Sequence, residues 1–474
     1  MTRLLPADSE GKTAARSTSA WNLVLPAVRS ILCQSAHVPR PLLELARRGV
    51  AVDLVASGEF QNLLCRAAEV GAGRVRVLPE PDRDRRYELA LLWDPASGAD
   101  VDAWLRRLAT LTHEPAEIAV WSRNPWNRHV RAVRTAPHWL AVDHALRRAG
   151  WRPALAQLGL PGADRVRQIV GWSHYARTPL VQHRRSHRFW KAWIVRQPAY
   201  RWLLPARLLR ATRSGKEFSQ TVLDRILEAA SHACGHRVRC SRLLVSPNGV
   251  AIVRVHIERP PNGANAILKV PLTAGAEPRV AANAAALQWM VSRTHELGPW
   301  ARVAPGLLGR GDVGGWSYTL EECVEGSEAQ GWCGKDAERA MSHMAAFLET
   351  LARLGDPARP LDAQGLESLY GAHVRRTVAL LEPMLAQRLQ EIWGQVVQAL
   401  EGVRVPRLPR PGDLTLENVL GAPARPDRLR LLDWELWTPC GLPLLDVLHL
   451  IASRRRREIG VSMGGSVRRW LLTG

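Results

Sequence analysis

Two Asn-Gly pairs, Asn248-Gly249 and Asn262-Gly263, constrain the fold of this chain more than any other feature. They separate three short apolar runs. An Asn-Gly pair between alternating apolar segments is the strongest local signal for a β-hairpin, because a type I′ turn needs positive φ at both central positions. The pattern predicts a three-stranded antiparallel meander over Ser241–Val245, Val250–Glu258 and Asn265–Val270.

Mostly helical periodicity surrounds this meander, as expected for an α+β domain. One helix precedes the meander and one follows it, then comes a further strand pair, and three longer helices occupy the region beyond Gly326. The predicted helices are Glu217–Cys234, Arg279–His295, Ala337–Leu354, Gly365–Leu381 and Pro383–Glu401, and the strand pair is Ala304–Leu308 with Trp316–Cys323.

Strands and helices alternate between Trp21 and Arg185, which predicts an α/β domain with a parallel sheet covered on both faces. The overall fold class is therefore α/β followed by α+β. The predicted strands are Arg29–Cys33, Val50–Val55, Arg74–Leu78, Leu89–Trp93 and Glu117–Trp121, and the predicted helices are Pro41–Arg48, Val101–Leu111 and Trp139–Ala149.

Length and composition indicate a globular chain of two or three domains: it has 474 residues, of which 46% are apolar. The net charge of +21 attracts polyanions. No RNA-recognition signature accompanies that charge, so no specific nucleic-acid partner is expected.

The sequence contains no run of 18 apolar residues, so no membrane span is predicted. Residues 1–20 form a Ser/Thr/Ala-rich tail without a signal-peptide core, and none of the seven cysteines forms a CxxC pair, so we expect a disordered tail and a cytoplasmic protein.

Residues 186–215 differ from their surroundings because they are rich in Trp and Arg. The simpler interpretation is a linker helix that packs its Trp face on a domain. The alternative is peripheral membrane association through residues 186–213, with Trp at the interface and Arg toward anionic head groups.

The segment Pro411–Trp437 carries the side chains of a phosphoryl-transfer site. The carboxylate of Asp413 can accept a proton from an attacking hydroxyl. The amide of Asn418 and the carboxylate of Asp433 can hold a metal, and the hairpin between them folds Asp433 back beside Asn418. Magnesium suits such a site, because it binds through one or two carboxylates and substrate phosphates.

This segment, D-x-x-x-x-N followed by an apolar strand and D-W-E, resembles the aminoglycoside phosphotransferase and choline kinase superfamily. The resemblance covers residues 216–474 and implies a bilobal protein-kinase-like fold, with an N-lobe at about 216–325 and a C-lobe at about 326–474 that ends early. It implies that ATP and Mg²⁺ are the cofactors. It assigns Lys269 to the nucleotide phosphates and Asp446 to bracing the catalytic loop, and it places the adenine against a hinge at Glu322, Cys323 and Val324.

The chain departs from the family pattern at three points. Pro411 stands where the family motif usually has His, Ala285 stands where a lysine-pairing Glu is expected, with Glu277 as the nearest substitute, and no G-x-G-x-x-G loop is present. Two functions therefore stay open. One is a small-molecule kinase that phosphorylates a hydroxyl of a sugar, an aminoglycoside-like compound or a glycan precursor. The other is a catalytically degenerate pseudokinase/pseudo-methyltransferase scaffold.

The N-terminal domain, residues 21–185, resembles a class I S-adenosylmethionine-dependent methyltransferase. The resemblance rests on Tyr87–Asp94, Glu117–Arg128 and Arg147–Trp151 in the order of that Rossmann-type fold. The turn after its first strand contains no glycine, and Asp53 lies two residues before the position of the family's cofactor-binding acid. We therefore expect a shell without cofactor, with methyl transfer as the alternative.

Overall fold

The computed structural model describes most of the chain between residues 21 and 459. The described residues are 21–35, 39–56, 74–78, 80–93, 95, 98–123, 139–162, 165–171, 206–213, 217–246, 248–258, 263–332, 334–379, 381–422, 425–441 and 444–459.

The chain divides into two compact units. Unit 1 contains Met1–Val280 and Leu308–Glu321, and unit 2 contains Ala281–Leu307 and Glu322–Gly474. These limits differ from the domain limits expected near residues 185 and 216. The meander belongs to the same unit as the N-terminal strands, because hydrogen-bonded strands link the two regions into one sheet of 13 strands.

The first half of unit 1 is the predicted parallel sheet. Its strand order is β3-β2-β1-β4-β5, so the order reverses between β1 and β4, as in Rossmann-like folds. These strands agree closely with the sequence prediction. They are β1 (Ser30–Ser35), β2 (Ala51–Ala56), β3 (Val75–Leu78), β4 (Leu89–Trp93) and β5 (Glu117–Arg123).

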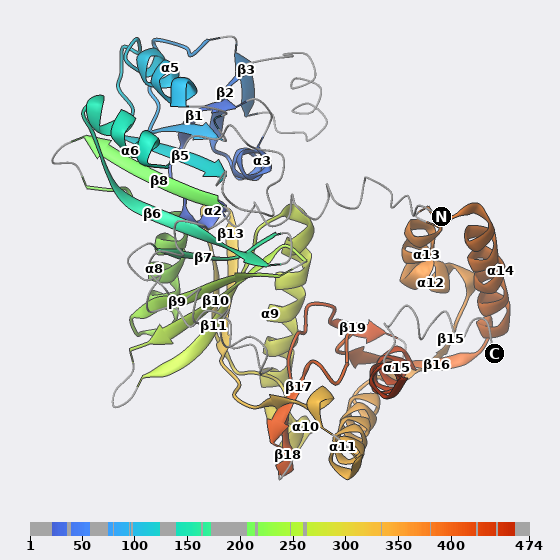
Figure 1. Ribbon diagram of the computed structural model, residues 1–474. Helices are drawn as coiled ribbons and strands as arrows, with labels where there is room; N and C mark the ends of the chain where they lie inside the picture. The colour runs from blue at the N-terminus through green and yellow to red at the C-terminus, as the bar shows by residue number, and fades with distance from the viewer. Residues whose placement is uncertain are drawn as a thin grey trace. The chain divides into compact units, whose positions relative to one another are not determined.

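Helices cover both faces of the parallel strands, which explains why β4 is buried along its whole length. Successive side chains of a strand point to opposite faces. Accordingly, Ile31 packs in a core with α3 (Arg40–Arg47), whereas Leu32 packs in a second core with α5 (Gly98–Leu108) and α6 (Trp139–Arg148) (Figure 1). The small helix α2 (Trp21–Val24) contacts α3.

Antiparallel strands extend this sheet beyond β5. Strand β8 (Ala206–Arg213) lies between β5 and β6 (Trp151–Gly162), and β7 (Arg165–Gly171) connects β6 to the meander. The helix expected over 186–215 is therefore wrong for residues 206–213, which form a strand because the edges of β5 and β6 supply hydrogen-bond partners on both sides. Residues 186–205, the rest of the proposed membrane-binding segment, lie outside the described residues.

The predicted meander is confirmed as β9 (Val238–Val245), β10 (Val250–Ile257) and β11 (Ala264–Pro271). Its first turn differs from expectation. Gly249 has φ 79°, but Asn248 does not have positive φ, and Gly249 N–H donates to the carbonyl of Ser246 at 3.1 Å. The connection is a four-residue loop and not a two-residue type I′ turn. Strands β12 (Leu307–Val313) and β13 (Trp316–Glu322) complete the edge, and α8 (Val222–Cys234) precedes the meander.

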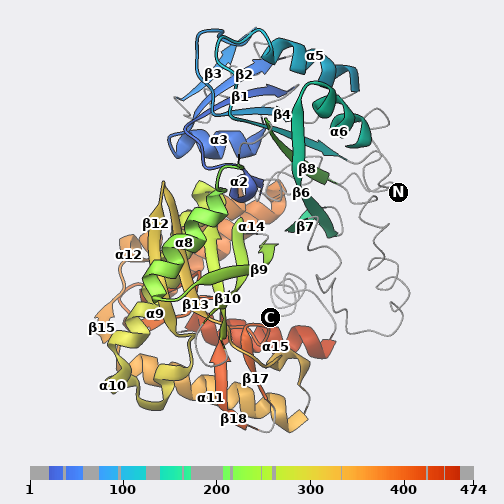
Figure 2. The same ribbon diagram turned by 90° about the vertical axis from the view of Figure 1, so that its left-hand side faces the viewer.

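Unit 2 is mainly helical and contains two three-stranded sheets. In the hairpin of β17 (Val419–Ala422) and β18 (Arg425–Leu431), β18 contacts α11 (Gly334–Arg353) (Figures 1 and 2). Helix α14 (Pro383–Leu400) contacts both α12 (Ala363–Leu366) and α13 (Ala372–Val378). The elements from the unit boundary onward are α9 (Glu277–Ser292), α10 (Thr294–Leu297), β14 (Ser327–Glu328), α11 (Gly334–Arg353), β15 (Asp356–Pro360), α12 (Ala363–Leu366), α13 (Ala372–Val378), α14 (Pro383–Leu400), β16 (Arg404–Arg410), β17 (Val419–Ala422), β18 (Arg425–Leu431), β19 (Thr438–Gly441) and α15 (Leu444–Ile459).

Aromatic side chains form the centre of unit 2. Trp434 is fully buried and packs edge-on against Phe347 and Trp437, and its indole N–H donates to the carbonyl of Leu431 at 2.9 Å. This core lies directly behind the end of β18, so it fixes the segment that begins at Asp433. None of the described helices has both the length and the apolarity that a bilayer span requires.

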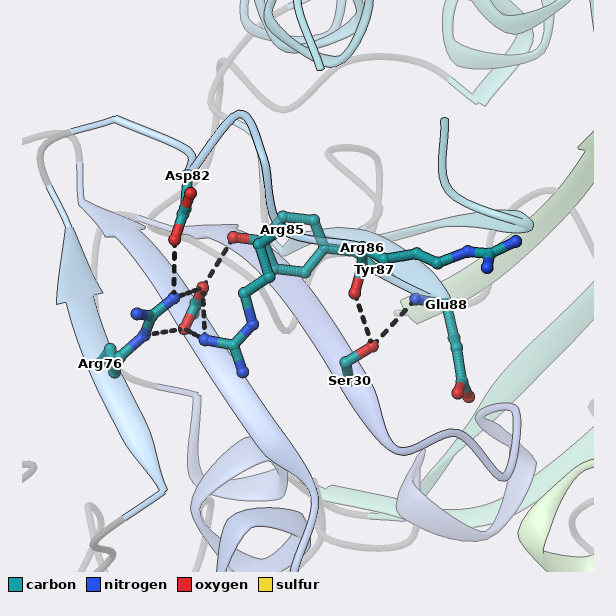
Figure 3. A network of polar contacts seen from close by, with 8 residues as sticks. Ser30, Arg76, Asp82, Arg85, Arg86, Tyr87 and Glu88 are labelled. Carbon is teal, nitrogen blue, oxygen red and sulfur yellow. Dashed lines mark hydrogen bonds and ion pairs between the residues drawn. The ribbon is translucent and has the colours of Figure 1, made fainter. Parts of the chain in front are cut away.

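A buried carboxylate anchors β2 in the parallel sheet of unit 1. Asp53 is fully buried, and it accepts hydrogen bonds from Arg76 at 2.6 and 2.8 Å, from Arg85 at 2.9 and 3.0 Å, and from the Tyr87 hydroxyl at 2.7 Å. Figure 3 shows these partners and Asp82, which also contacts Arg76. Burial alone would raise the pKa of Asp53, but the bonds and charges of Arg76, Tyr87 and Arg85 outweigh it and hold the pKa below its usual range. Five hydrogen bonds therefore already occupy this carboxylate.

We predict that Asp53→Asn destabilises unit 1 by about 3 kcal/mol, because it leaves two arginines without their buried partner. The folded state lowers the pKa of Asp53, so Asp53 stabilises the fold fully at pH values above the unfolded-state aspartate pKa of about 3.9. This stabilisation is lost as the pH falls through the lower folded-state pKa. Thermal melts from pH 7 to pH 2 should therefore show that the wild type loses stability as the pH falls, and that Asp53→Asn loses less.

Asp82→Asn is the matched control, because Asp82 contacts the same Arg76 but its side chain is 40% exposed. Its expected cost is below about 0.5 kcal/mol. Equal costs for the two variants would contradict the role assigned to burial.

Candidate active site

The loop after β16 is held by a carboxylate from α15. Asp446 is fully buried, and its Oδ1 accepts the N–H groups of Gly412 at 3.0 Å and Leu414 at 3.3 Å, while its Oδ2 accepts Arg410 Nε at 3.2 Å. A loop has no strand partner for its backbone N–H groups, so a buried acceptor must take that place. Asp446 therefore holds the backbone on both sides of Asp413.

Gly412 allows this loop to approach the segment that follows Asp433. It has φ 90°, and an ideal Cβ at this position would overlap the carbonyl oxygen of Leu436. Only glycine combines the left-handed conformation with this close approach. The Pro411-Gly412-Asp413 sequence thus fixes the distance between two strand-end loops.

Asp413 and Asn418 are joined directly. Asn418 Nδ2 donates to the backbone carbonyl of Asp413 at 3.0 Å and to its Oδ2 at 3.3 Å. The backbone between them is a tight turn, in which Thr415 N–H donates to the Asp413 carbonyl and Asn418 N–H donates to the Thr415 carbonyl, each at 3.0 Å. Because the amide nitrogen makes both side-chain bonds, the amide oxygen of Asn418 is used in neither.

Asp433 follows β18 in a conformation that no other described non-glycine residue adopts, with φ 61°. Its Oδ1 is buried and has no hydrogen-bond partner. The preceding residue, Leu432, donates its N–H to the backbone carbonyl of Asn418 at 2.8 Å, so Asp433 starts directly beside Asn418. Strained backbone and an unsatisfied buried oxygen are both costly, and both cluster at functional sites.

The electrostatics of Asp413 result from these neighbours. Burial raises the pKa of Asp413 above its usual range, and the negative charges of Asp433 and Asp446 add to that effect. A protonated His449 and the hydrogen bond from Asn418 oppose this effect only in part. The site therefore favours a carboxylate that takes up a proton more readily than an ordinary aspartate.

Sequence reasoning missed His449, whose Nδ1 lies 3.9 Å from Asp413 Oδ1. This nitrogen is buried and has no hydrogen-bond partner. His449 stands three residues after Asp446 on α15, and residues at this spacing share a helix face. Once Asp446 is assigned to the loop, that spacing is the signal that could have identified His449.

The donor set fits a magnesium ion. Among the residues that the structure describes, no group of three or more His, Cys, Asp and Glu side chains could hold a metal by itself. Mg²⁺ commonly uses one or two carboxylates, with substrate phosphates and water as its other ligands. The unsatisfied Oδ1 of Asp433 and the amide oxygen of Asn418 are oxygen donors of the required kind.

Lys269 lies in unit 1, on β11, with its side chain only 8% exposed. Its Nζ is 3.2 Å from Oε1 of Glu321, the last residue of unit 1 on β13. Glu277, the acid suggested as its partner, is instead 2.9 Å from Nη2 of Arg48. That suggestion was wrong because α3, which lies far away in the sequence, ends beside the start of α9 in the fold.

The expected hinge coincides with the boundary between the compact units, which falls between Glu321 and Glu322. Glu322 N–H donates to the Gly306 carbonyl at 2.8 Å, and its side chain accepts Arg430 Nη2 at 2.7 Å. Burial would raise the pKa of Glu322, but Arg430 and the Gly306 N–H outweigh it and lower the pKa. This backbone N–H is therefore already used, and the adenine contacts of Cys323 and Val324 stay a prediction.

Two kinds of protein are among the solved structures that are similar to this chain. One is the aminoglycoside phosphotransferase APH(3'')-Id from Streptomyces rimosus, at 18% identity and a TM-score of 0.34. The match includes 52% of this chain and 85% of the Streptomyces chain. A thermostable mutant of APH(4)-Ia in ternary complex with ADP and hygromycin B covers 52% of this chain and 81% of its own, at 14% identity and a TM-score of 0.36.

The second kind is a cyclopropane-fatty-acyl-phospholipid synthase-like protein from Lactobacillus casei. It covers 44% of this chain and 94% of its own, at 10% identity and a TM-score of 0.29. The chain is thus similar to aminoglycoside phosphotransferases over about half its length, with one distant methyltransferase-like match. No family model and no curated protein matches it.

We predict that Gly412→Ala destabilises unit 2 by about 3 kcal/mol, because it combines backbone strain with overlap against Leu436. Gly402→Ala is the matched control, since Gly402 has φ 77° but nothing lies within 4 Å of an added Cβ. Its expected cost is about 1–2 kcal/mol. Urea unfolding of both variants measures the difference, and equal costs would show that the contact with Leu436 is unimportant.

Proposed function

We propose that this protein is an ATP- and magnesium-dependent phosphotransferase that acts on a hydroxyl of a small molecule. The supporting observation is the cluster of Asp413, Asn418 and Asp433 on two loops that Asp446 and Gly412 bring together. One carboxylate in this cluster has a raised pKa, and the other has a buried oxygen without a partner.

In the proposed reaction, Asp413 accepts the proton of the attacking hydroxyl. The bond from Asn418 Nδ2 to Asp413 Oδ2 holds the carboxylate in one orientation and leaves its Oδ1 for the substrate. The neighbouring charge of Asp433 favours uptake of that proton. Phosphoryl transfer depends mostly on positioning and charge neutralisation, so a rigid loop suits it.

The proposal assigns Asp433 and Asn418 to the metal. When bound, Mg²⁺ neutralises the charge that develops on the transferring phosphoryl group. Lys269 is assigned to the nucleotide phosphates, since a compact ammonium suits that role and its pairing with Glu321 holds it in place. The acceptor proposed is a sugar, an aminoglycoside-like compound or a glycan precursor.

We predict that Asp413→Asn reduces turnover by about 10²- to 10⁴-fold, the usual contribution of a general base. The variant keeps the shape of the side chain, so Mg-ATP affinity should change little. Transfer of labelled phosphate from ATP to a panel of sugars and aminoglycosides measures turnover, and isothermal titration measures affinity. Unchanged turnover would refute the proposed base and would favour the scaffold alternative.

Asp433→Asn is the complementary variant. It removes the charge assigned to the metal and leaves the proposed base intact. We expect Mg-ATP affinity to fall at least tenfold. The control is Asp336→Asn on the exposed surface of α11, which should leave affinity unchanged. Retention of magnesium-dependent affinity in Asp433→Asn would remove Asp433 from the metal site.

We further predict that His449→Ala shifts the acid limb of the kcat profile to higher pH. Protonated His449 lowers the pKa of Asp413, so its removal lets that pKa rise further. Activity requires the unprotonated carboxylate and should therefore be lost earlier as the pH falls. His449→Lys keeps a positive charge and should restore the wild-type limb. An unchanged limb in His449→Ala would show that His449 has no such influence.

A further inference from the structure

A pocket of about 500 Å³ opens in unit 1, and all of its lining residues belong to that unit. Three segments of its lining end directly before parallel strands: Arg29 precedes β1, Val50 precedes β2 and Glu88 precedes β4. The pocket therefore lies at the amino-terminal edge of the sheet. Open α/β sheets usually bind ligands at the opposite, carboxyl edge, so this pocket is separate from the crevice of a methyltransferase-like fold.

Apolar side chains form the walls of the pocket. Ala27, Val28, Val50 and Val313 line it, and all four are only partly buried although they pack against the core of unit 1. Trp316 adds an aromatic surface from the start of β13. Partly buried apolar walls in a cavity of this size are typical of a site for a small organic ligand.

Three arginines line the same pocket, against a single carboxylate, Glu88. Within the part of the chain that the structure describes, the guanidinium groups of Arg29 and Arg225 have no hydrogen bond or ion pair. Glu88 accepts the backbone N–H of Arg29 at 2.9 Å, and among the described residues it forms no ion pair with either guanidinium group. Two guanidinium groups are thus available to an anion at this pocket.

Arg48, the third arginine, is a structural member of the wall. Its side chain is 5% exposed, lies 4.0 Å from the centre of the Trp316 ring, and is balanced by Glu44 and Glu277. Its Nη2 also donates to the carbonyl of Pro271 at 3.3 Å. Arg48 therefore connects the wall of the pocket to the end of β11 and to the start of α9.

We propose that this pocket binds an organic carboxylate with an apolar body. Arginine presents paired N–H donors that match a carboxylate, and the apolar walls match a hydrocarbon chain or ring. An inorganic anion would use the arginines and leave the walls in water. A neutral alcohol would use the walls and leave the arginines without a partner. The ligand chemistry that satisfies both parts of the lining is amphiphilic and anionic.

The experiment is isothermal titration of the full-length protein with decanoate, below its micelle concentration. We expect one saturable site, with acetate and decanol each binding at least tenfold more weakly. Arg29→Ala and Arg225→Ala should each weaken decanoate binding about tenfold, the usual loss of one charged hydrogen-bonding partner. Both side chains are exposed, so these variants should fold.

Arg106→Ala is the matched control, because Arg106 is exposed on α5 of the same unit and does not line the pocket. It should bind decanoate like the wild type. Hydrogen–deuterium exchange locates the ligand: decanoate should protect residues 26–31 and 313–316. Equal affinity for decanoate and decanol, an equal loss in Arg106→Ala, protection only at other segments, or no saturable binding would each overturn the proposal.

Discussion

The candidate site depends on a buried carboxylate that never needs to react. Asp446 has no exposure to solvent, and an ionised group in such a place is tolerated only when hydrogen bonds replace its water. It obtains them from the N–H groups of Gly412 and Leu414 and from the guanidinium of Arg410. The same bonds give a loop without strand partners one defined path. The hydrogen bonds that satisfy Asp446 therefore also fix the position of Asp413, which lies between Gly412 and Leu414.

Four aspartates of this chain fall into two classes by how well their oxygens are satisfied. Asp53 and Asp446 are fully buried and saturated by arginine and by hydroxyl or backbone donors, so each connects distant segments of its own unit. Asp413 and Asp433 lie close together, repel each other, and include a buried oxygen without a partner. Saturated acids stabilise a fold, whereas an under-satisfied pair is arranged for a proton or a metal.

A comparable contrast applies to the arginines of unit 1. Arg48, Arg76 and Arg85 are used internally, where each neutralises a buried or half-buried acid. Arg29 and Arg225 line an apolar pocket without such a partner among the described residues. In a chain with a net charge of +21, exposed arginine by itself indicates little. The combination of these arginines with partly buried apolar walls is what supports the proposed ligand site at this edge of the sheet.

Local sequence was enough to determine the elements whose signals are local. Alternating apolar residues predicted β1 to β5 and the three meander strands, and helical periodicity predicted α3, α5, α6, α11 and α14. The D-x-x-x-x-N spacing likewise singled out Asp413 and Asn418, because a tight turn joins residues five apart.

Tertiary structure decided what depends on partners distant in sequence. Residues 206–213 became a strand because two open sheet edges flank them, Glu277 met Arg48 because α3 ends beside α9, and His449 faces Asp413 because α15 packs under the loop. Such contacts are set by the packing of whole elements, and no window of neighbouring residues contains that information.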